Sequence, residues 1–583
     1  LLVHSLTMAR PSLMLVVALA SASLATLGHA NFLRNGPPAG DHASVSRMET
    51  DLAKVRQALL KEIQGGLGDT RHATEARLAA HEDALRPMFA ALPKNEEGLL
   101  GHAVVRYALH RYFAQRHGWS VKGLDPAGGH WNSSSPSNIL LDRVPGLVQE
   151  LFEKRLDGHG LGLHDLAALA ATLEHVVHDD AVSRLEAAYT TLGLSTKAGN
   201  GKDEAMEALD TFMMTFVLGQ DIRSLSYAEL AAERASILQT YPSWEDTRAF
   251  AHDVYAKVSA SPQPLAASAS AQSEEFETAR RAVEAIQDQY GPWQDRECQA
   301  MKNALVKMEE GNNGRVQLVD FYGRKQEGGW QFVESMDYMR QVGALDETDP
   351  GNPRVIMANY VYSASNCLAS TGFYSVCCIN ECEAILGLVE QRLAAPSAPA
   401  QELATIVAGV PSATVPAPRN LSAQLVRRLE DIADHHEGLV PLHGRLFSQW
   451  LHHAFPRECP FPHEAGSTSP MSPEEWMAET GKSAIATPRA MEQHTSAREG
   501  SAAGTAAVEA APIPWVVAEE LVPPARPVRL RSPEHFRRLA SGVAFLATIV
   551  AMAYSLWQAL PKFRSSKTEA ATLLPLLGKQ HWA

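Results

Sequence analysis

The segment from Glu309 to Asp320 has the residue types and the close spacing that a cation-binding loop needs. Its candidate ligands are oxygen donors: Glu309, Asn313, the main-chain carbonyl of Arg315, Gln317 and Asp320. Carboxylate, amide and main-chain carbonyl oxygens are the ligands that Ca²⁺ prefers in proteins. We therefore predict a candidate calcium site here, and the sequence identifies no other cofactor by name.

This loop resembles that of the EF-hand family over about thirty residues. Gly314 stands at the sixth position, Val316 at the apolar eighth and Asp320 at the twelfth. Three positions depart from the family pattern. Glu309 replaces the usual first aspartate, Gly311 offers no side-chain oxygen at the third, and Asp320 is shorter than the bidentate glutamate of the twelfth. The resemblance implies a helix–loop–helix unit and leaves two alternatives, a calcium site or an EF-like structural turn.

EF-hands usually occur in pairs, and an acidic turn at 346–351 follows the first loop. Gly351 is again sixth when this turn is counted from Asp346, but Asn352 and Pro353 break the pattern. The second turn is therefore a poorer candidate for calcium.

Four of the six cysteines lie close together in the sequence, and two lie far from them. The cluster is Cys367, Cys377, Cys378 and Cys382, and the outlying pair is Cys298 and Cys459. Zinc sites favour Cys-x-x-Cys pairs, which this cluster lacks. An even number of cysteines in a secretory chain predicts disulfides, here three. In these bonds the outlying cysteines join neighbouring segments to the cluster. The connectivity stays open, and a redox-active bond between Cys377 and Cys378 is an alternative.

Two histidine groups have partial metal-ligand spacing. His175, His178 and Asp179 share one side of a predicted helix, but the H-E-x-x-H order is absent, so we interpret them as a solvated helix face. The other group surrounds the sequence FPRECPFPH and consists of His452, His453, Cys459 and His463. Its prolines favour a rigid extended segment packed across a domain surface.

The signatures of several common enzyme classes are absent or incomplete. Gly481-Lys482-Ser483 matches the end of a P-loop, but Trp476 stands where the first glycine belongs. Neither a G-x-S-x-G elbow nor a kinase motif set occurs. The net charge of −14 without a basic cluster argues against a nucleic-acid partner.

The segments that would position these residues are mainly helical. Ser46-x-x-Glu49 is a capping box that opens an amphipathic helix to Ile63, and 95–118 carries an apolar stripe from Leu100 to Tyr112. Further helices are expected at 136–155, 163–177, 180–193, 203–218, 226–239 and 244–258. Downstream we predict one long helix broken at Gly291-Pro292, and a short strand within 355–362.

Composition divides the chain into modules of a mainly α fold with little β structure. They are a signal peptide (1–30, including an upstream gene-model extension), an all-helical domain (31–258), a linker (259–272), an EF-hand-like and cysteine-rich module (273–393), a second linker (394–418), a helical segment that ends in cysteine and histidine (419–463), a disordered stalk (464–538), a transmembrane helix (539–560) and a cytosolic tail (561–583).

Two apolar segments predict where the protein resides. Residues 13–27 follow Arg10 and precede Gly28-His29-Ala30, as in a cleavable secretory signal, and residues 539–560 are free of charge and long enough to cross a bilayer. Arginines before this span favour a cytosolic N-side, but a signal ahead of a long domain overrides them. We predict a single-pass type I glycoprotein of the secretory pathway or cell surface, with sequons at Asn132 and Asn420.

A plastid-associated membrane is the alternative location, since in some algae a secretory signal also starts the route to a plastid. The tail segment 569–574 resembles the acidic dileucine motif of vesicle cargo, a pattern that also arises by chance.

The blocks SNCLASTGFYSVCCINECEAIL and VPLHGRLFSQWLHHAFPRECPFPH resemble those of an uncharacterised helix-rich family of algae and related protists. The similarity covers residues 131–463 and implies a common fold without an assigned activity.

These observations predict a membrane-tethered interaction module or calcium-responsive module without enzymatic activity, which binds protein partners through its helical domain. The alternative is a secretory-pathway metalloprotein or enzyme that uses the cysteine- and histidine-rich C-terminal module.

Overall fold

Helices make up most of the described chain, and the strands are few and short, which confirms the mainly α prediction. The computed structural model describes residues 71–124, 136–140, 152–153, 156, 160–197, 201–261, 274–323, 325–326, 329–368, 371–469, 471–496 and 515–522. The signal segment, the helix predicted at 46–63, Asn132, the apolar run 539–560 and the tail lie outside these residues. Within them, no helix combines the length and the apolar character that a bilayer crossing requires.

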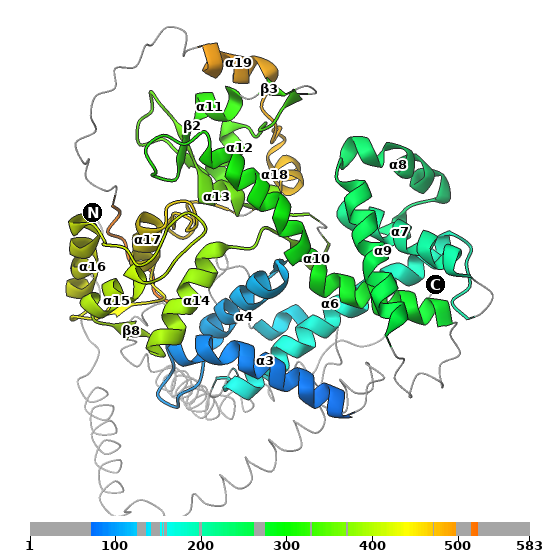
Figure 1. Cartoon of the computed structure of the whole chain (residues 1–583), viewed down its shortest axis with the longest axis horizontal. Coiled ribbons are helices and arrows are strands. Elements are labelled where there is room, and N and C mark those ends of the chain that lie inside the picture. The colour runs from blue at the N-terminus through cyan, green and yellow to red at the C-terminus, as the bar shows by residue number, and fades with distance from the viewer. Residues whose placement is uncertain are drawn as a thin grey trace, which may run out of the picture. The chain divides into compact units, whose positions relative to one another are not determined.

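The N-terminal half consists of helices around one apolar core (Figure 1). The helices are α3 (Arg71–Ala91), α4 (His102–His117), α6 (Leu163–Thr191), α7 (Lys202–Val217), α8 (Tyr227–Thr240) and α9 (Trp244–Ala260), with 3-10 turns at η1 (Pro136–Leu140) and η2 (Ile222–Ser224). Helix α3 packs along α6 and against α4. α6 is continuous where two helices were predicted, because its sequence contains no glycine or proline that would end it.

Helix α10 (Glu274–Val306) is also continuous, so the predicted break at Gly291-Pro292 is wrong. Pro292 removes one helical N–H, but the packing of α10 against α4 keeps the helix together. Gly291 allows this packing, since a Cβ there would lie 1.8 Å from the carbonyl oxygen of His117. Gly118, at φ +69°, ends α4 beside this contact.

A second core lies beyond α10 and contains most of the β structure. Its elements are β2 (Arg315–Gln317), α11 (Leu318–Gly323), β3 (Lys325–Gln326), β4 (Gly329–Trp330), α12 (Met336–Gln341), β5 (Leu345–Asp346), β6 (Arg354–Ile356), α13 (Met357–Val361) and η4 (Ala364–Asn366). β6 lies between β2 and β5 in an antiparallel three-stranded sheet. The strand predicted within 355–362 is therefore confined to its start, and the remainder is helical.

Strand β1 (Trp119–Val121) pairs antiparallel with β7 (Tyr374–Val376), so the cysteine region contributes to the core of the helical half. The remaining elements form a third core: α14 (Glu381–Leu393), β8 (Ser397–Ala398), α15 (Ala400–Ala408), α16 (Ala423–His435), β9 (Val440–Pro441) and α17 (Arg445–Ala454). All the described residues belong to one compact unit.

Two segments predicted to lack structure are folded. The predicted linker 394–418 contains α15, because Leu403 and Val407 at helical spacing are fully buried. The predicted disordered stalk contains α18 (Pro473–Thr480) and α19 (Pro488–Ser496). Ser472 caps α18 with a capping box, and Trp476 is buried against Tyr338. A low average hydrophobicity concealed these few well-placed apolar residues.

Candidate functional site

The residues predicted to bind calcium lie in the first of two paired helix–loop–helix units. The first loop (residues 307–317) joins α10 to α11, and the second loop (residues 342–356) joins α12 to α13. The two loops pair through β2 and β6, with Val316 opposite Val355. This cross-strand pair lies at the apolar eighth position of the first loop, so the loop is held by the sheet and by the end of α10.

Arg457, which the calcium prediction did not include, supplies a positive charge to the first loop. Its Nε donates to Oε2 of Glu309 at 2.6 Å, and its Nη2 donates to Oδ1 of Asn312 at 2.5 Å. The other carboxylate oxygen of Glu309 accepts the main-chain N–H of Gly314. Because the Glu309 side chain is only 1% exposed, the guanidinium is the cation that balances its charge.

Gly314 allows the segment that carries Arg457 to approach. Its φ is +74°, and a Cβ there would lie 2.1 Å from the carbonyl oxygen of Pro456. The sixth-position glycine therefore serves both the turn of the loop and its contact with residues 456–457.

The other predicted ligands contact neighbours within the loops. The Oδ1 of Asn313 accepts the N–H of Arg315 at 3.0 Å, and the Gln317 amide donates to Oε2 of Glu310 at 2.6 Å. Asp320 lies in the first turn of α11 and is partly buried. The side-chain oxygens of Glu309 and Asn313 therefore accept hydrogen bonds from within the chain, and the Gln317 amide is bonded to Glu310.

The second loop is a β5–β6 hairpin that also receives a positive charge from an arginine. The Nε of Arg315 donates to Oδ2 of Asp346 at 2.6 Å, while Thr348 donates its N–H and its hydroxyl to Oδ1. Burial alone would raise the pKa of Asp346, but the Thr348 hydrogen bonds and the Arg315 charge hold it below its usual value.

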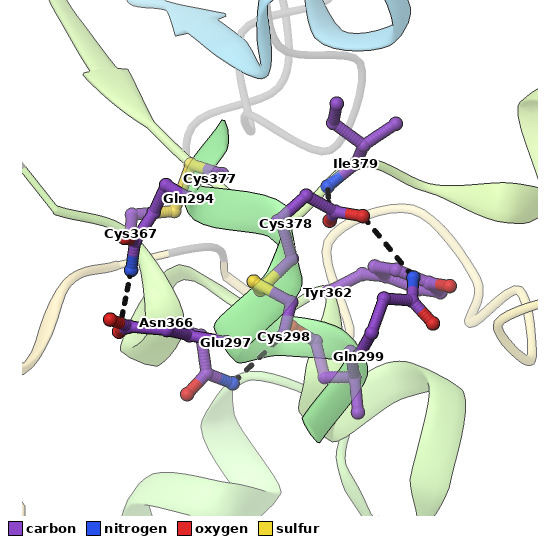
Figure 2. The surroundings of a disulfide bond; sticks show 12 residues. Gln294, Glu297, Cys298, Gln299, Tyr362, Asn366, Cys367, Cys377, Cys378 and Ile379 are labelled. Carbon is purple, nitrogen blue, oxygen red and sulfur yellow. Dashed lines mark hydrogen bonds between the residues drawn. A yellow bond between two sulfur atoms is a disulfide. The ribbon is translucent and has the colours of Figure 1, made fainter. Parts of the chain in front are cut away.

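All six cysteines form disulfide bonds, as predicted. Cys298 on α10 is bonded to Cys378, and the adjacent Cys377 is bonded to Cys367 (Figure 2). Cys382 pairs with Cys459 across a Cα–Cα distance of 4.6 Å. Both outlying cysteines therefore join the cluster, and the alternative bond between Cys377 and Cys378 does not form.

The C-terminal histidine group lies against the module that contains the two loops. His452 is fully buried and bonds through Nδ1 to the carbonyl of Cys459 at 2.7 Å, and burial lowers its pKa to about 3. His463 bonds through Nε2 to the carbonyl of Gly343. Asn359 pairs its amide with the main chain of Phe461 in both directions. The residues around FPRECPFPH pack across a surface, and main-chain atoms bind two of its histidines.

A third group of residues, which sequence analysis missed, lies inside the helical half. Two carboxylates and three imidazoles from four helices meet there: His81 (α3), His117 (α4), Glu174 and His178 (α6) and Asp288 (α10). We call this set the histidine cluster. The Nε2 atoms of His81 and His117 each lie 3.1 Å from a different oxygen of Glu174, and Nε2 of His178 lies 3.0 Å from Oδ1 of Asp288.

The histidine cluster is buried except on one side. His81, His117 and His178 are each 3% exposed, whereas the Asp288 side chain is 42% exposed. Burial would raise the pKa of Glu174, but hydrogen bonds to His117 and His81 hold it far below its usual value. Glu174 is therefore a buried carboxylate anion between two imidazoles.

The sequence carried only a weak signal for this cluster. His178 was predicted to lie on a solvated helix face, which is wrong because it is buried against Asp288. The His175 side chain is also mostly buried, at 15% exposure, and its Nε2 pairs with the exposed Asp179 at 3.1 Å. The useful signal was the spacing of Glu174 and His178, four residues apart and hence on the same face of a helix.

No family model matches this chain, and neither the curated proteins nor the solved structures contain a match. The resemblance to a helix-rich family of algae and protists therefore remains a prediction.

Proposed function

We propose that this chain is a membrane-tethered, non-enzymatic binding module in which calcium and Arg457 compete for the first loop. The contact that carries this proposal is the ion pair between Arg457 and the buried Glu309. Because the Glu309 side chain is buried, its carboxylate requires a neighbouring positive charge, which comes either from Arg457 or from a bound ion.

The competition follows from geometry and charge. Arg457 belongs to a segment fixed by the Cys382–Cys459 bond, so the guanidinium is held next to Glu309 at high effective concentration. Calcium must displace it before Glu309 can act as a ligand. Weak extracellular calcium modules bind at about 10⁻⁴ to 10⁻³ M, and the competing arginine places this loop at the weak end of that range.

Displacement of Arg457 would free the segment around it. Pro456 contacts Gly314, and Phe461 and His463 bind the same module. A calcium-dependent change here would therefore alter how the partly buried residues 456–457 and 460–463 pack on this module, which gives the module a calcium-responsive contact.

Calorimetric calcium titration of the full chain and of Arg457→Gln tests this proposal. We expect weak binding by the parent protein and at least roughly tenfold tighter binding by Arg457→Gln, because the competitor is gone. Arg340→Gln is the matched control, since Arg340 also pairs with carboxylates in this module but is exposed. Absence of calcium binding by both parent and Arg457→Gln at millimolar calcium would refute the calcium-responsive function.

We also propose that residues 31–538 are lumenal or extracellular. Three disulfides support an oxidising compartment, Asn420 is exposed and accessible for glycosylation, and the apolar run 539–560 would supply the anchor. Protease digestion of sealed vesicles checks this placement. We expect the N-terminal body to be protected, and its digestion from the cytosolic side would overturn the topology.

The alternative, a metalloprotein or enzyme that uses the C-terminal cysteine- and histidine-rich module, has less support. Cys459 is in a disulfide, and His452 and His463 bind main-chain carbonyls. No thiolate is available there, because none of the described cysteines is free.

A further inference from the structure

The histidine cluster contains the donor atoms of a metal site at suitable separations. One ligand atom from each of His117, Glu174 and Asp288 lies within 4.8 Å of the other two. Nitrogen and oxygen ligands at about 2.0–2.2 Å from a divalent transition metal lie roughly 3–4 Å from one another. Small side-chain adjustments therefore bring all three atoms onto one ion.

The environment of His117 favours a metal ligand. Its Nδ1 lies 3.4 Å from the main-chain carbonyl of Asp288, and this carbonyl lacks its helical donor because Pro292, four residues later, has no N–H. Metal-ligating histidines commonly donate one ring N–H to such a carbonyl and present the other nitrogen to the ion. His117 Nε2 is directed at the Glu174 carboxylate in this way.

Neighbouring rings hold this arrangement in place. Trp119 stacks on His117 with ring centroids 4.1 Å apart, which fixes the plane of the imidazole. His81 contacts the second oxygen of Glu174 through Nε2 and the hydroxyl of Tyr112 through Nδ1 at 2.6 Å. His178 contacts Oδ1 of Asp288 through Nε2 at 3.0 Å, and the same oxygen lies 3.8 Å from Nδ1 of His117. Each carboxylate thus has a histidine partner in addition to His117.

An ion could reach the cluster from the groove between α9 and α10. This pocket, of about 650 Å³, is lined by Asp288 itself, by Asp246 and Asp253, and by the basic side chains of Lys257 and Arg296. Three carboxylates against two basic side chains leave an excess of negative charge, which favours the entry of cations.

We propose that His117, Glu174 and Asp288 bind one divalent first-row transition metal ion, with His81 and His178 positioning the two carboxylates. Mixed imidazole and carboxylate ligands suit Zn²⁺, Fe²⁺ or Mn²⁺ better than Ca²⁺, which prefers oxygen ligands alone. This site is separate from the first loop and independent of the calcium proposal. The competing arrangement without metal is the hydrogen bond between His117 Nε2 and the Glu174 carboxylate.

Cobalt titration of the full chain tests the proposal, because Co²⁺ reports its ligands through visible d–d absorption and replaces zinc. We expect saturable, stoichiometric uptake that excess calcium does not reverse. His117→Gln and Asp288→Asn should each weaken uptake by at least roughly tenfold. Asp288 is the most exposed member of the cluster, so Asp288→Asn gives a folded variant if His117→Gln is unstable.

His175→Gln is the matched control, since His175 lies on α6 within one turn of the cluster but pairs with Asp179. It should bind cobalt as the parent protein does, and circular dichroism verifies that each variant is folded. If the folded parent protein takes up no cobalt, or if His175→Gln loses uptake as Asp288→Asn does, the metal site is refuted in favour of the metal-free hydrogen bond.

Discussion

The first loop and the histidine cluster both contain a buried carboxylate, but they balance its charge in different ways. Glu309 has an arginine from a distant segment, which carries a permanent positive charge. Glu174 instead accepts hydrogen bonds from two imidazoles, which carry no permanent charge. A site that already contains arginine accepts another cation only by displacing it, whereas Glu174 can share a metal ion with the imidazole of His117.

The largest expected effect is that of Glu174→Ala. Removal of one partner from a buried, hydrogen-bonded charge group costs about 4 kcal/mol of the free energy of unfolding, because His81 and His117 lose their common partner. Chemical denaturation with chelator present measures this cost without any contribution from metal. Asp179→Ala is the control on the same helix, and its exposed side chain should change stability by less than about 1 kcal/mol. Equal costs for both variants would contradict the central role of Glu174.

The difference between these two regions also explains what the sequence could predict. The first loop was recognisable because Glu309, Gly314 and Val316 are close in sequence, and their spacing alone defines the turn. The histidine cluster was missed because His81, Glu174 and Asp288 are far apart and meet only after three helices have packed. Arg457 was missed for the same reason.

The fold shows the same limit. Regular helices such as α4 were predicted from apolar periodicity, and the disulfides from cysteine count and compartment. The continuity of α10 was not predictable, because it depends on the contact of Gly291 with α4, and the pairing of β1 with β7 joins segments with no local signal. Folded segments with low hydrophobicity, such as α18, depend on single buried side chains like Trp476.

Loss of the Cys382–Cys459 bond tests whether this disulfide keeps Arg457 next to Glu309. The double variant Cys382→Ser, Cys459→Ser should lose about 4 kcal/mol of stability, since the bond closes a loop with a sequence separation of 77. It should also bind calcium more tightly in the first loop, because Arg457 is no longer held there. Cys367→Ser, Cys377→Ser is the control, with a separation of 10, a smaller loss of stability and no change in calcium affinity. A double variant without either effect would show that the segment holds Arg457 unaided.

A third buried carboxylate, Glu390, is paired with both an arginine and a histidine. We expect this group to make the stability of the fold sensitive to acid. Arg111 on α4 pairs with Glu390 on α14 at 2.6 Å and with Glu383, and His443 contacts Glu390 at 2.7 Å. Although burial opposes it, the charge of Arg111 and hydrogen bonds from His443 and Arg111 lower the pKa of Glu390 to about 2. Burial also lowers the pKa of His443.

Both lowered pKa values stabilise the folded state at neutral pH, and this stabilisation is lost in acid. The contribution of His443 declines as the pH falls below 6.5, the ordinary pKa of histidine. The contribution of Glu390 declines as the pH falls from about 4.5 towards 2. The Glu390 shift corresponds to at most about 3 kcal/mol. Urea denaturation between pH 7 and pH 3 measures this slope, and Glu390→Gln should flatten it. An unchanged slope in Glu390→Gln would assign the acid sensitivity to other groups.

The smallest expected effect on stability is that of Arg457→Gln. This variant most directly distinguishes the first loop from the histidine cluster by the ion that each one binds. Without the guanidinium, the buried Glu309 carboxylate keeps only its hydrogen bond from Gly314, which should cost about 2 kcal/mol of stability in the absence of calcium. Saturating calcium should restore much of this loss in Arg457→Gln, because an ion that binds only the folded state raises its stability. Arg340→Gln, whose ion pairs are exposed, should change little with or without calcium. If cobalt rather than calcium restored the stability of Arg457→Gln, the effect would belong to an imidazole site, and the distinction between the two regions would fail.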